Sequence, residues 1–146
     1  MRHVFLVDNS VLQRVHRSPA VADALIELLS YGDLGGCLPQ RLEEGYSARS
    51  AREHDAIMEA SDRARIFLTP DERVAEIAID LQRRLFHAGT GRAAGVSDLQ
   101  IAATAIRHSA DRQRVVVVHY DADFDSIAQV APELEHRWIV PRGSVD

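Results

Sequence analysis

The sequence predicts an α/β fold with a mostly parallel central sheet, and two observations carry this prediction. Short apolar runs, such as residues 3–7 and the β-branched run at residues 115–118, recur along the chain. Between them lie longer stretches with the apolar spacing of amphipathic helices. This alternation is typical of a parallel sheet covered by helices on both faces. At 146 residues, the chain is expected to form one domain with its own core.

The first half of the chain is expected to contain three strands and two helical regions. The strands are the apolar runs at residues 3–7, 35–38 and 65–68. A helix is predicted after Pro19 and is expected to end at Gly32. Its apolar face consists of Val21, Ala24, Leu25, Leu28 and Leu29. From Pro39 to about Ala64 the pattern is helical in two pieces. The residues predicted to face inward there are Leu42, Tyr46, Ile57 and Met58.

In the second half, Thr69 and Pro70 predict a helix start, with Thr69 as N-cap and Pro70 at the first helical position. The apolar face of this helix consists of Val74, Ile77, Ala78, Leu81 and Leu85. The glycine-rich residues 89–95 lack a phosphate-binding pattern and predict a connecting loop. Ser97 is expected to cap the next helix. Strands at residues 115–118 and 137–140 complete the predicted sheet.

Asp98 is predicted to lie on the buried face of that next helix. Its side chain and the apolar ones that follow have the spacing i, i+3, i+4, i+7 and i+8 of a single helix face. This face consists of Asp98, Ile101, Ala102, Ala105 and Ile106. A carboxylate there points inward, where an isolated charge is costly unless a cation receives it. The alternative is that Asp98 only stabilises the start of its own helix.

More acids follow two of the predicted strands. Asp8 comes after residues 3–7, and Asp121 and Asp123 come after residues 115–118. In parallel sheets, ligands bind beyond the carboxyl ends of the strands, where the strand order reverses. The chain has no lysine to neutralise such a group of acids. The acids therefore predict a divalent metal site, and oxygen ligands favour Mg²⁺ or Mn²⁺ over zinc.

Composition limits the remaining function classes. The single Cys37 excludes a disulfide framework and a cysteine zinc site. No apolar run approaches the ~20 residues of a membrane span, and the N-terminal run is too short for a signal peptide, so a cytoplasmic protein without a membrane partner is expected. The net charge of -5 argues weakly against nucleic acid. However, all 17 basic residues are arginine, which binds phosphate bidentately.

Taken in order, these segments resemble the PIN-domain ribonucleases, specifically the VapC toxins of type II toxin–antitoxin pairs. Each motif alone is weak, whereas their order and intervals over nearly the whole chain are specific. The motifs are LVDNSVL (residues 6–12), LEEGYSARS (42–50), VSDLQIAATA (96–105), VVVVHYDADFDSIA (115–128) and RWIVPRGS (137–144). The resemblance implies a single PIN domain over residues 1–146, with a three-layer α/β/α architecture.

The resemblance implies an acidic site for catalysis and metal binding. Its residues are Asp8, Glu43, Asp98 and Asp121, with Asp123 as a fifth contributor. Helical periodicity does not choose between Glu43 and Glu44, and only the match of residues 42–47 to the family pattern favours Glu43. Spacing also leaves open whether Asp121 or Asp123 binds the metal directly, and whether one metal binds or two.

Other positions have less specific expectations. Ser10 is a candidate to orient Asp8 or a substrate phosphate. His119 stands where many relatives carry threonine, and no metal-binding role is expected for it. Asp125 is expected on the surface or as the cap of the following turn, and Trp138 is expected in the core.

The function implied by the resemblance is that of a ribonuclease toxin. Mg²⁺ (or Mn²⁺) would activate water for cleavage of tRNA or ribosomal RNA, which inhibits translation. Tyr46, Arg49 and Arg52 are candidates to contact RNA, although a solvated helix face accounts for the arginines equally well. The resemblance also implies a VapB-type antitoxin that covers the acidic groove, a toxin homodimer and a toxin–antitoxin hetero-oligomer.

Two other functions compete with this interpretation. Phosphoacceptor receiver domains and haloacid-dehalogenase-type phosphatases also place acids at the carboxyl end of a parallel sheet. Both depend on a lysine near the phosphate, which this chain lacks. A PIN fold that serves only as a binding module is the other alternative. Loss of site acids would indicate such a module, and here all of them are present.

Overall fold

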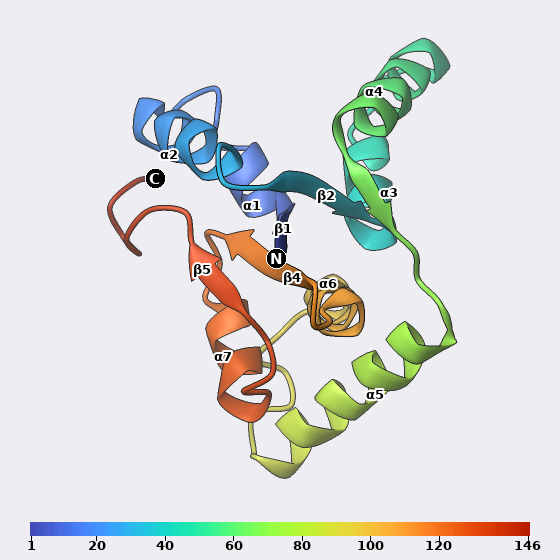
Figure 1. Ribbon diagram of the computed structural model, residues 1–146, viewed down its shortest axis with the longest axis vertical. Coiled ribbons are helices and arrows are strands. Elements are labelled where there is room, and N and C mark those ends of the chain that lie inside the picture. Colours follow the sequence, from blue (N-terminus) through green and yellow to red (C-terminus); the bar gives the residue numbers. More distant parts are fainter.

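A computed structural model describes residues 1–146 and confirms the predicted α/β architecture, with one five-stranded parallel sheet between helices (Figure 1). The strands are β1 (Arg2–Val7), β2 (Asp33–Cys37), β3 (Ile66–Leu68), β4 (Gln113–His119) and β5 (His136–Trp138). Their order in the sheet is β3-β2-β1-β4-β5, and all neighbouring strands are parallel. The chain builds outward from β1 to β3 and then crosses to the other side, so the strand order reverses between β1 and β4.

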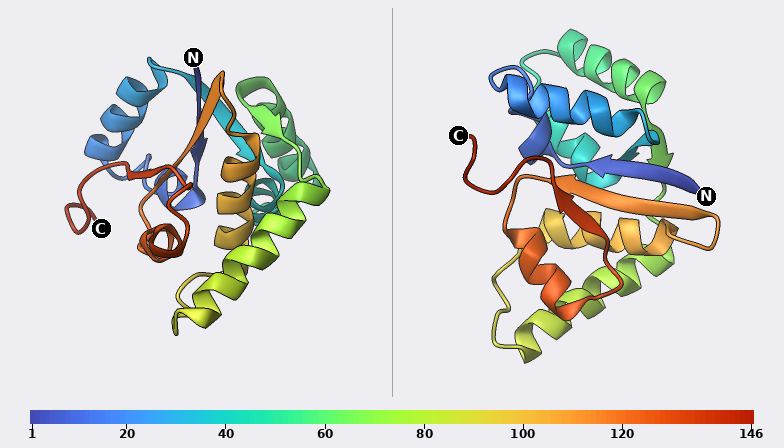
Figure 2. Two further views of the ribbon diagram at one scale, coloured as in Figure 1. Left: turned by 60° about the horizontal axis from the view of Figure 1, so that its bottom comes forward. Right: turned by 60° about the vertical axis from the view of Figure 1, so that its left-hand side comes forward.

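Seven helices connect and cover these strands. They are α1 (Asn9–Leu12), α2 (Pro19–Leu29), α3 (Leu38–Tyr46), α4 (Ala51–Ala64), α5 (Glu72–His87), α6 (Val96–His108) and α7 (Asp123–Val130). Figure 2 shows α2 on one side of the sheet and α5, α6 and α7 on the other. None of the helices combines the length and apolar character that a membrane crossing requires.

The sheet separates two hydrophobic clusters, because successive side chains of a strand point to opposite faces. On one face, Val4 and Leu6 of β1 pack with Val117 of β4 and with apolar side chains of α5, α6 and α7. On the other face, Phe5 and Val7 pack in a smaller cluster with residues of α1 and α2. β1 and β4 are thus buried on both faces, which holds their carboxyl ends in fixed positions.

The apolar face of α6 is as the sequence predicts. Ile101, Ala102 and Ala105 are fully buried in the larger cluster, and Asp98 lies on the same face, half-buried, in the first turn. The predicted start of α6 is wrong, because the N-cap is Gly95 and Ser97 lies inside the first turn. The main-chain carbonyl of Gly95 already accepts the first helical hydrogen bond, from the amide of Leu99.

The predicted start of α5 is also wrong. The helix begins at Glu72, and its N-cap is Asp71 rather than Thr69. The Asp71 carboxylate accepts a hydrogen bond from the Val74 amide at 3.0 Å. A carboxylate near a helix N-terminus is further stabilised by the helix dipole, and here Asp71 also forms an ion pair with Arg107 of α6. These contacts favour a start two residues later than Pro70.

Two side chains predicted to face the core are on the surface. Leu42 and Tyr46 of α3 are 63% and 92% exposed, whereas Ile57 and Met58 of α4 are half-buried. The apolar spacing of α3 therefore marks an open surface rather than a core face. The other differences are small: α2 ends at Leu29 instead of Gly32, and β2 and β5 are displaced by one or two residues from their predicted ranges.

Candidate metal centre

Three carboxylates converge at the carboxyl edge of the sheet. Asp8 follows β1, Asp121 follows β4, and Asp98 lies in the first turn of α6, which begins at this edge. One carboxylate oxygen of each residue lies within 4.8 Å of those of the other two. Asp8 and Asp121 come from the two strands between which the strand order reverses. This is the position at which parallel sheets bind their ligands.

Asp8 is held by the turn that follows β1. Its main-chain amide donates to the carbonyl of Val118 at 2.9 Å, which extends the pairing of β1 with β4 by one residue. The amide of Ser10 donates to Asp8 Oδ2 at 3.1 Å, and Ser10 Oγ accepts the amide of Tyr120 at 2.9 Å. Ser10 therefore orients Asp8 through its main chain, while its hydroxyl joins the ends of the two central strands.

Asp123 supports the cluster from the first turn of α7. Its amide donates to Asp121 Oδ1 at 2.9 Å and so fixes the Asp121 carboxylate. After burial, a hydrogen bond with the Asp123 carboxylate is the next cause that raises the pKa of Asp98. Asp123 thus touches two of the three clustered acids without being one of the group whose oxygens meet within 4.8 Å.

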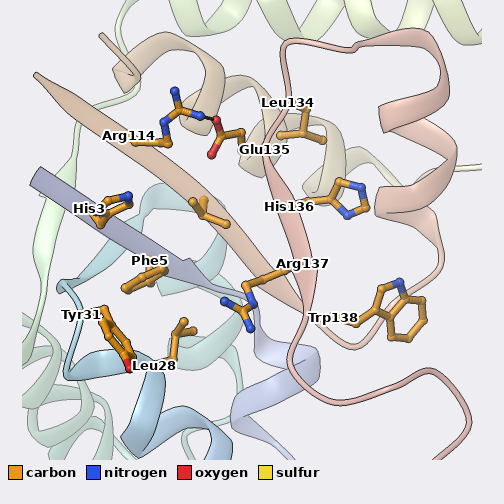
Figure 3. Close-up of a pocket in the computed structure, with 11 residues that line it drawn as sticks. His3, Phe5, Leu28, Tyr31, Arg114, Leu134, Glu135, His136, Arg137 and Trp138 are labelled. Atoms are coloured by element: carbon orange, nitrogen blue, oxygen red, sulfur yellow. Dashed lines mark ion pairs between the residues drawn. The ribbon is translucent and has the colours of Figure 1, made fainter. Parts of the chain in front are cut away.

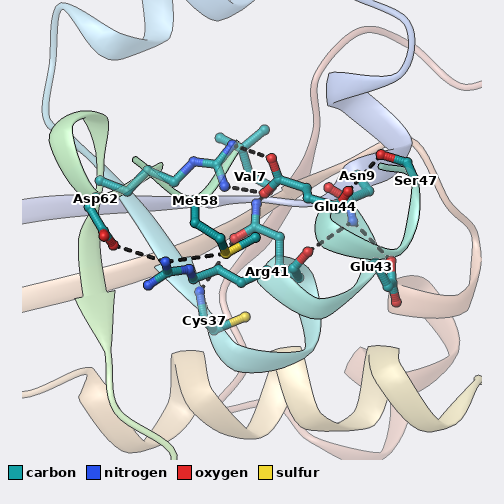
Figure 4. A network of polar contacts seen from close by, with 11 residues as sticks. Val7, Asn9, Cys37, Arg41, Glu43, Glu44, Ser47, Met58 and Asp62 are labelled. Carbon is teal, nitrogen blue, oxygen red and sulfur yellow. Dashed lines mark hydrogen bonds and ion pairs between the residues drawn. The ribbon is translucent and has the colours of Figure 1, made fainter. Parts of the chain in front are cut away.

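Glu43 and Glu44 point in different directions from α3 (Figure 4). Glu43 Oε2 accepts a hydrogen bond from the Asn9 side-chain amide at 3.0 Å, and Asn9 is the residue directly after Asp8. The charge of Glu43 also raises the pKa of Asp8, after the larger effect of burial. Glu44 instead forms an ion pair with Arg65, whose side chain is only 10% exposed. Glu43 therefore borders the cluster, and Glu44 does not.

All three clustered acids have raised pKa values. Burial is the largest cause in each case. Burial raises the pKa of Asp98 to about 8, together with the hydrogen bond that protonated Asp98 donates to Asp123 and the charges of Asp121 and Asp8. The pKa values of Asp8 and Asp121 are also raised by neighbouring carboxylates. Carboxylates that are this close together, one buried and two half-buried, cannot all be ionised cheaply without a cation.

No arginine or histidine forms an ion pair with any of the three. The ion pairs of the structure involve other acids, such as Asp33, Asp62, Asp71, Asp80 and Glu133. The three carboxylates supply only hard oxygen ligands, without cysteine or histidine. This donor set fits a divalent cation such as Mg²⁺ or Mn²⁺ better than zinc or copper.

The surface beside the cluster is open and partly apolar. A hollow between α3 and α6 is lined by Leu42, Glu43, Tyr46, Ser97 and Gln100, among others. A larger hollow lies between α2 and β5 and contains none of the clustered acids (Figure 3). Of the predicted site acids, Glu43 lines the smaller groove, and Ser97, the residue before Asp98, lies at its wall.

Comparison with known proteins identifies the family. The family model described as PIN domain matches residues 5–130. Ribonuclease VapC51 of Mycobacterium tuberculosis (strain ATCC 25618 / H37Rv) is 37% identical over 142 residues, which are 97% of each chain. The chain belongs to the VapC ribonucleases, a family of PIN-domain proteins.

Chains in solved VapBC structures share the fold, which confirms the predicted PIN-like architecture. A chain in the structure of VapBC-1 from nontypeable Haemophilus influenzae has a TM-score of 0.71 and 17% identity, covering 93% of this chain and 98% of that one. A chain of VapBC-5 from Mycobacterium tuberculosis, a member of the VapBC family of toxin–antitoxin systems, has a TM-score of 0.61 and 19% identity, with coverages of 91% and 96%.

Sequence reasoning missed two residues of this VapC chain that support the site, Asn9 and Gln40. The side-chain amide of Asn9 donates a hydrogen bond to Glu43, which lies 34 residues further along the chain. The fully buried Gln40 donates to the carbonyl of Val7 and accepts from the amide of Cys37. Gln40 thereby ties α3 to the end of β1 that carries Asp8. Its i, i+3 spacing from Cys37 matches a capping box with cysteine in place of serine or threonine, and this is the only clue that the sequence offers.

The residues expected to flank the VapC site differ in their surroundings. Tyr46 is almost fully exposed at the groove beside Glu43, whereas Arg49 and Arg52 are exposed near the start of α4. Asp125 is not the cap of α7, because it lies in the first helical turn and accepts the indole N–H of Trp138 at 3.1 Å. Trp138 itself is half-buried rather than part of the core.

Proposed function

We propose that this protein is a single PIN domain over residues 1–146 that acts as the toxin of a type II toxin–antitoxin pair and cleaves RNA with Mg²⁺ or Mn²⁺. The observation that carries the proposal is the convergence of Asp8, Asp98 and Asp121 at the point where the strand order reverses. The VapC family membership supports tRNA or ribosomal RNA as the substrate class, and RNA as a substrate implies action in the cytoplasm.

In this proposal, Asp8, Asp98 and Asp121 hold the cation, and Glu43 and Asp123 complete its surroundings. A bound divalent ion supplies an activated water and stabilises negative charge on the scissile phosphate. The protein contributes orientation: the Ser10 amide fixes Asp8, the Asp123 amide fixes Asp121, and the Asn9 side chain fixes Glu43. Fixed ligands lower the cost of reorganisation during the reaction.

We further propose that the partner is a VapB-type antitoxin, and that the toxin forms a homodimer within a toxin–antitoxin hetero-oligomer. The VapBC structures that share this fold support an antitoxin partner. The exposed apolar side chains of Leu42 and Tyr46, which line one groove with Glu43, also support it, because exposed apolar surface commonly marks a protein interface.

The test is RNA cleavage by the purified toxin. We expect cleavage of total RNA with Mn²⁺ and none with EDTA, and sequencing of the new 5′ ends would identify the target. Asp111→Asn is the matched control, because it removes one exposed carboxylate that has no partner in the structure and lies outside the site. A protein that binds RNA or a partner but cleaves no RNA with any divalent ion would be a binding module, and the proposal would be wrong.

The neighbours Glu43 and Glu44 provide an internal comparison. Glu43→Gln is expected to lower metal affinity or cleavage by about 10-fold or more, with little effect on folding, because Glu43 is exposed and bonded only to Asn9. Glu44→Gln is expected to keep near wild-type cleavage per folded molecule. It should lower the free energy of unfolding by about 1–2 kcal/mol, because the buried Arg65 loses its ionic partner. Thermal melts and initial rates separate the two effects, and the reverse pattern would exclude Glu43 from the site.

A further inference from the structure

The last residue of β4, His119, touches the loop that carries Asp121. His119 is fully buried, and its Nδ1 accepts the main-chain amide of Asp121 at 3.2 Å. Its Nε2 lies 2.8 Å from Nδ1 of His136 on β5. We infer that His119 is a positioning residue that holds Asp121 through this amide, and that His136 fixes the ring of His119. The inference rests on the proposed role of Asp121 as a metal ligand.

The hydrogen bonds assign the proton of each ring. Because the Asp121 amide donates to Nδ1 of His119, the single proton of the neutral His119 ring is on Nε2. That N–H donates to Nδ1 of His136, so the proton of a neutral His136 is on its own Nε2. The Asp121 amide therefore donates to His119, and His119 donates in turn to His136 on β5. Moving the proton to the other nitrogen of either ring would place two donors or two acceptors opposite each other.

Packing holds the His119 ring in this orientation. The Phe124 ring of α7 lies 4.9 Å from it, and the Trp138 ring of β5 meets it edge-on at 5.1 Å. Figure 3 shows His136 and Trp138 on the opposite side of β5 from Arg137. The Trp138 indole also donates to Asp125 in the first turn of α7. β5 thus braces both the end of β4 and the helix that follows Asp121.

The same neighbourhood has the composition of a transition-metal site, and the hydrogen bonds argue against that role. His119, Asp125 and His136 offer two nitrogens and an oxygen within 4.8 Å of one another. A metal on Nε2 of His119 needs a lone pair there, and ligating histidines normally donate through their other nitrogen. Here the other nitrogen accepts the Asp121 amide, so the ring proton occupies the position that a metal would need.

Two amide substitutions separate the two nitrogens of His119. The oxygen of asparagine can occupy the place of Nδ1, whereas the end of glutamine reaches the place of Nε2. His119→Asn is therefore expected to keep the hydrogen bond to the Asp121 amide and a Mn²⁺ Kd within about 3-fold of wild type. His119→Gln is expected to weaken Mn²⁺ binding by about 10–100-fold, which is the usual effect of losing a residue that hydrogen-bonds to a metal ligand. Both variants lose the same ring packing, so their melting temperatures should fall alike.

The readouts are calorimetric titration with Mn²⁺ and the NMR signal of the Asp121 amide without metal. Protection of that amide from exchange should persist in His119→Asn and disappear in His119→Gln. On β5, His136→Asn should preserve the protection of the Asp121 amide better than His136→Leu, because asparagine keeps an acceptor for the Nε2–H of His119.

Equal Mn²⁺ affinity and equal amide protection in His119→Asn and His119→Gln would overturn the inference. So would a Zn²⁺ equivalent that binds the wild type and is lost in His136→Leu, because the trio would then be a metal site. Suppose instead that the wild type binds no Mn²⁺ while the Asp121 amide is still protected in His119→Asn and unprotected in His119→Gln. In that case the proposed function would be wrong, and the hydrogen bond between His119 and the Asp121 amide would stand.

Discussion

Asp98→Asn is expected to abolish RNA cleavage while the protein remains folded. The substitution removes one of three converging carboxylates. Loss of a residue that only hydrogen-bonds to a metal ligand costs up to about 100-fold in activity, so loss of a ligand itself should cost more than this. The fold should tolerate it, because the pKa of Asp98 is raised to about 8 by burial and by Asp123, Asp121 and Asp8. A neutral amide at this position relieves repulsion instead of adding it.

Initial rates of RNA cleavage and growth inhibition on expression measure the loss, and circular dichroism checks the fold. Asp8→Asn should behave in the same way, because its carboxylate belongs to the same group. Asp111→Asn should cleave at the wild-type rate. Full cleavage by Asp98→Asn, with unchanged Mn²⁺ affinity, would show that the metal centre lies elsewhere.

The second large effect is a metal-dependent gain in stability that grows with pH. Without metal, the folded protein keeps a proton on Asp98 up to about pH 8, whereas the unfolded chain loses it near the ordinary pKa of 3.8. Between these values the folded state binds more protons, so the free energy of unfolding of the metal-free protein should fall as pH rises. Mn²⁺ must displace this proton, so its affinity should increase over the same interval.

Thermal melts with and without Mn²⁺ at about pH 5.5 and about pH 8 test both trends. A hundredfold excess of Mn²⁺ over Kd should add about 2.7 kcal/mol to the free energy of unfolding. In Asp98→Asn, both the pH dependence without metal and the shift with Mn²⁺ should shrink. If Mn²⁺ raised the melting temperature equally in the two proteins, it would be binding outside the acidic cluster.

The sequence was sufficient for those features that depend on local spacing or on chain order. The apolar runs of β1 and β4 and the buried face of α6 are regular, and together they bring Asp8, Asp98 and Asp121 to one edge. Helix starts were harder to predict, because Asp71 competes with Thr69 as N-cap through its contact with Arg107, 36 residues away.

Where burial or orientation depends on a partner from a distant segment, local periodicity was not enough. Leu42 and Tyr46 have the spacing of a core face, yet no element covers them. Periodicity also could not separate Glu43 from Glu44, because their directions are distinguished by Asn9 and Arg65, which are far from both in the sequence. The pairing of His119 with His136 is of the same kind.

The pairing of β1 with β4 also governs when the acidic cluster can first exist. Residues 2–7 pair with residues 113–118, so the two central strands are separated by more than two thirds of the chain. Closing so long a loop is a late and slow event compared with forming local helices. A chain still under synthesis that ends before β4 contains Asp8, Glu43 and Asp98. It does not yet contain Asp121 or the strand that positions Asp121 beside them. If the acidic cluster is the catalytic centre, as proposed above, the nascent chain is inactive until β4 and Asp121 have been made and have joined the fold.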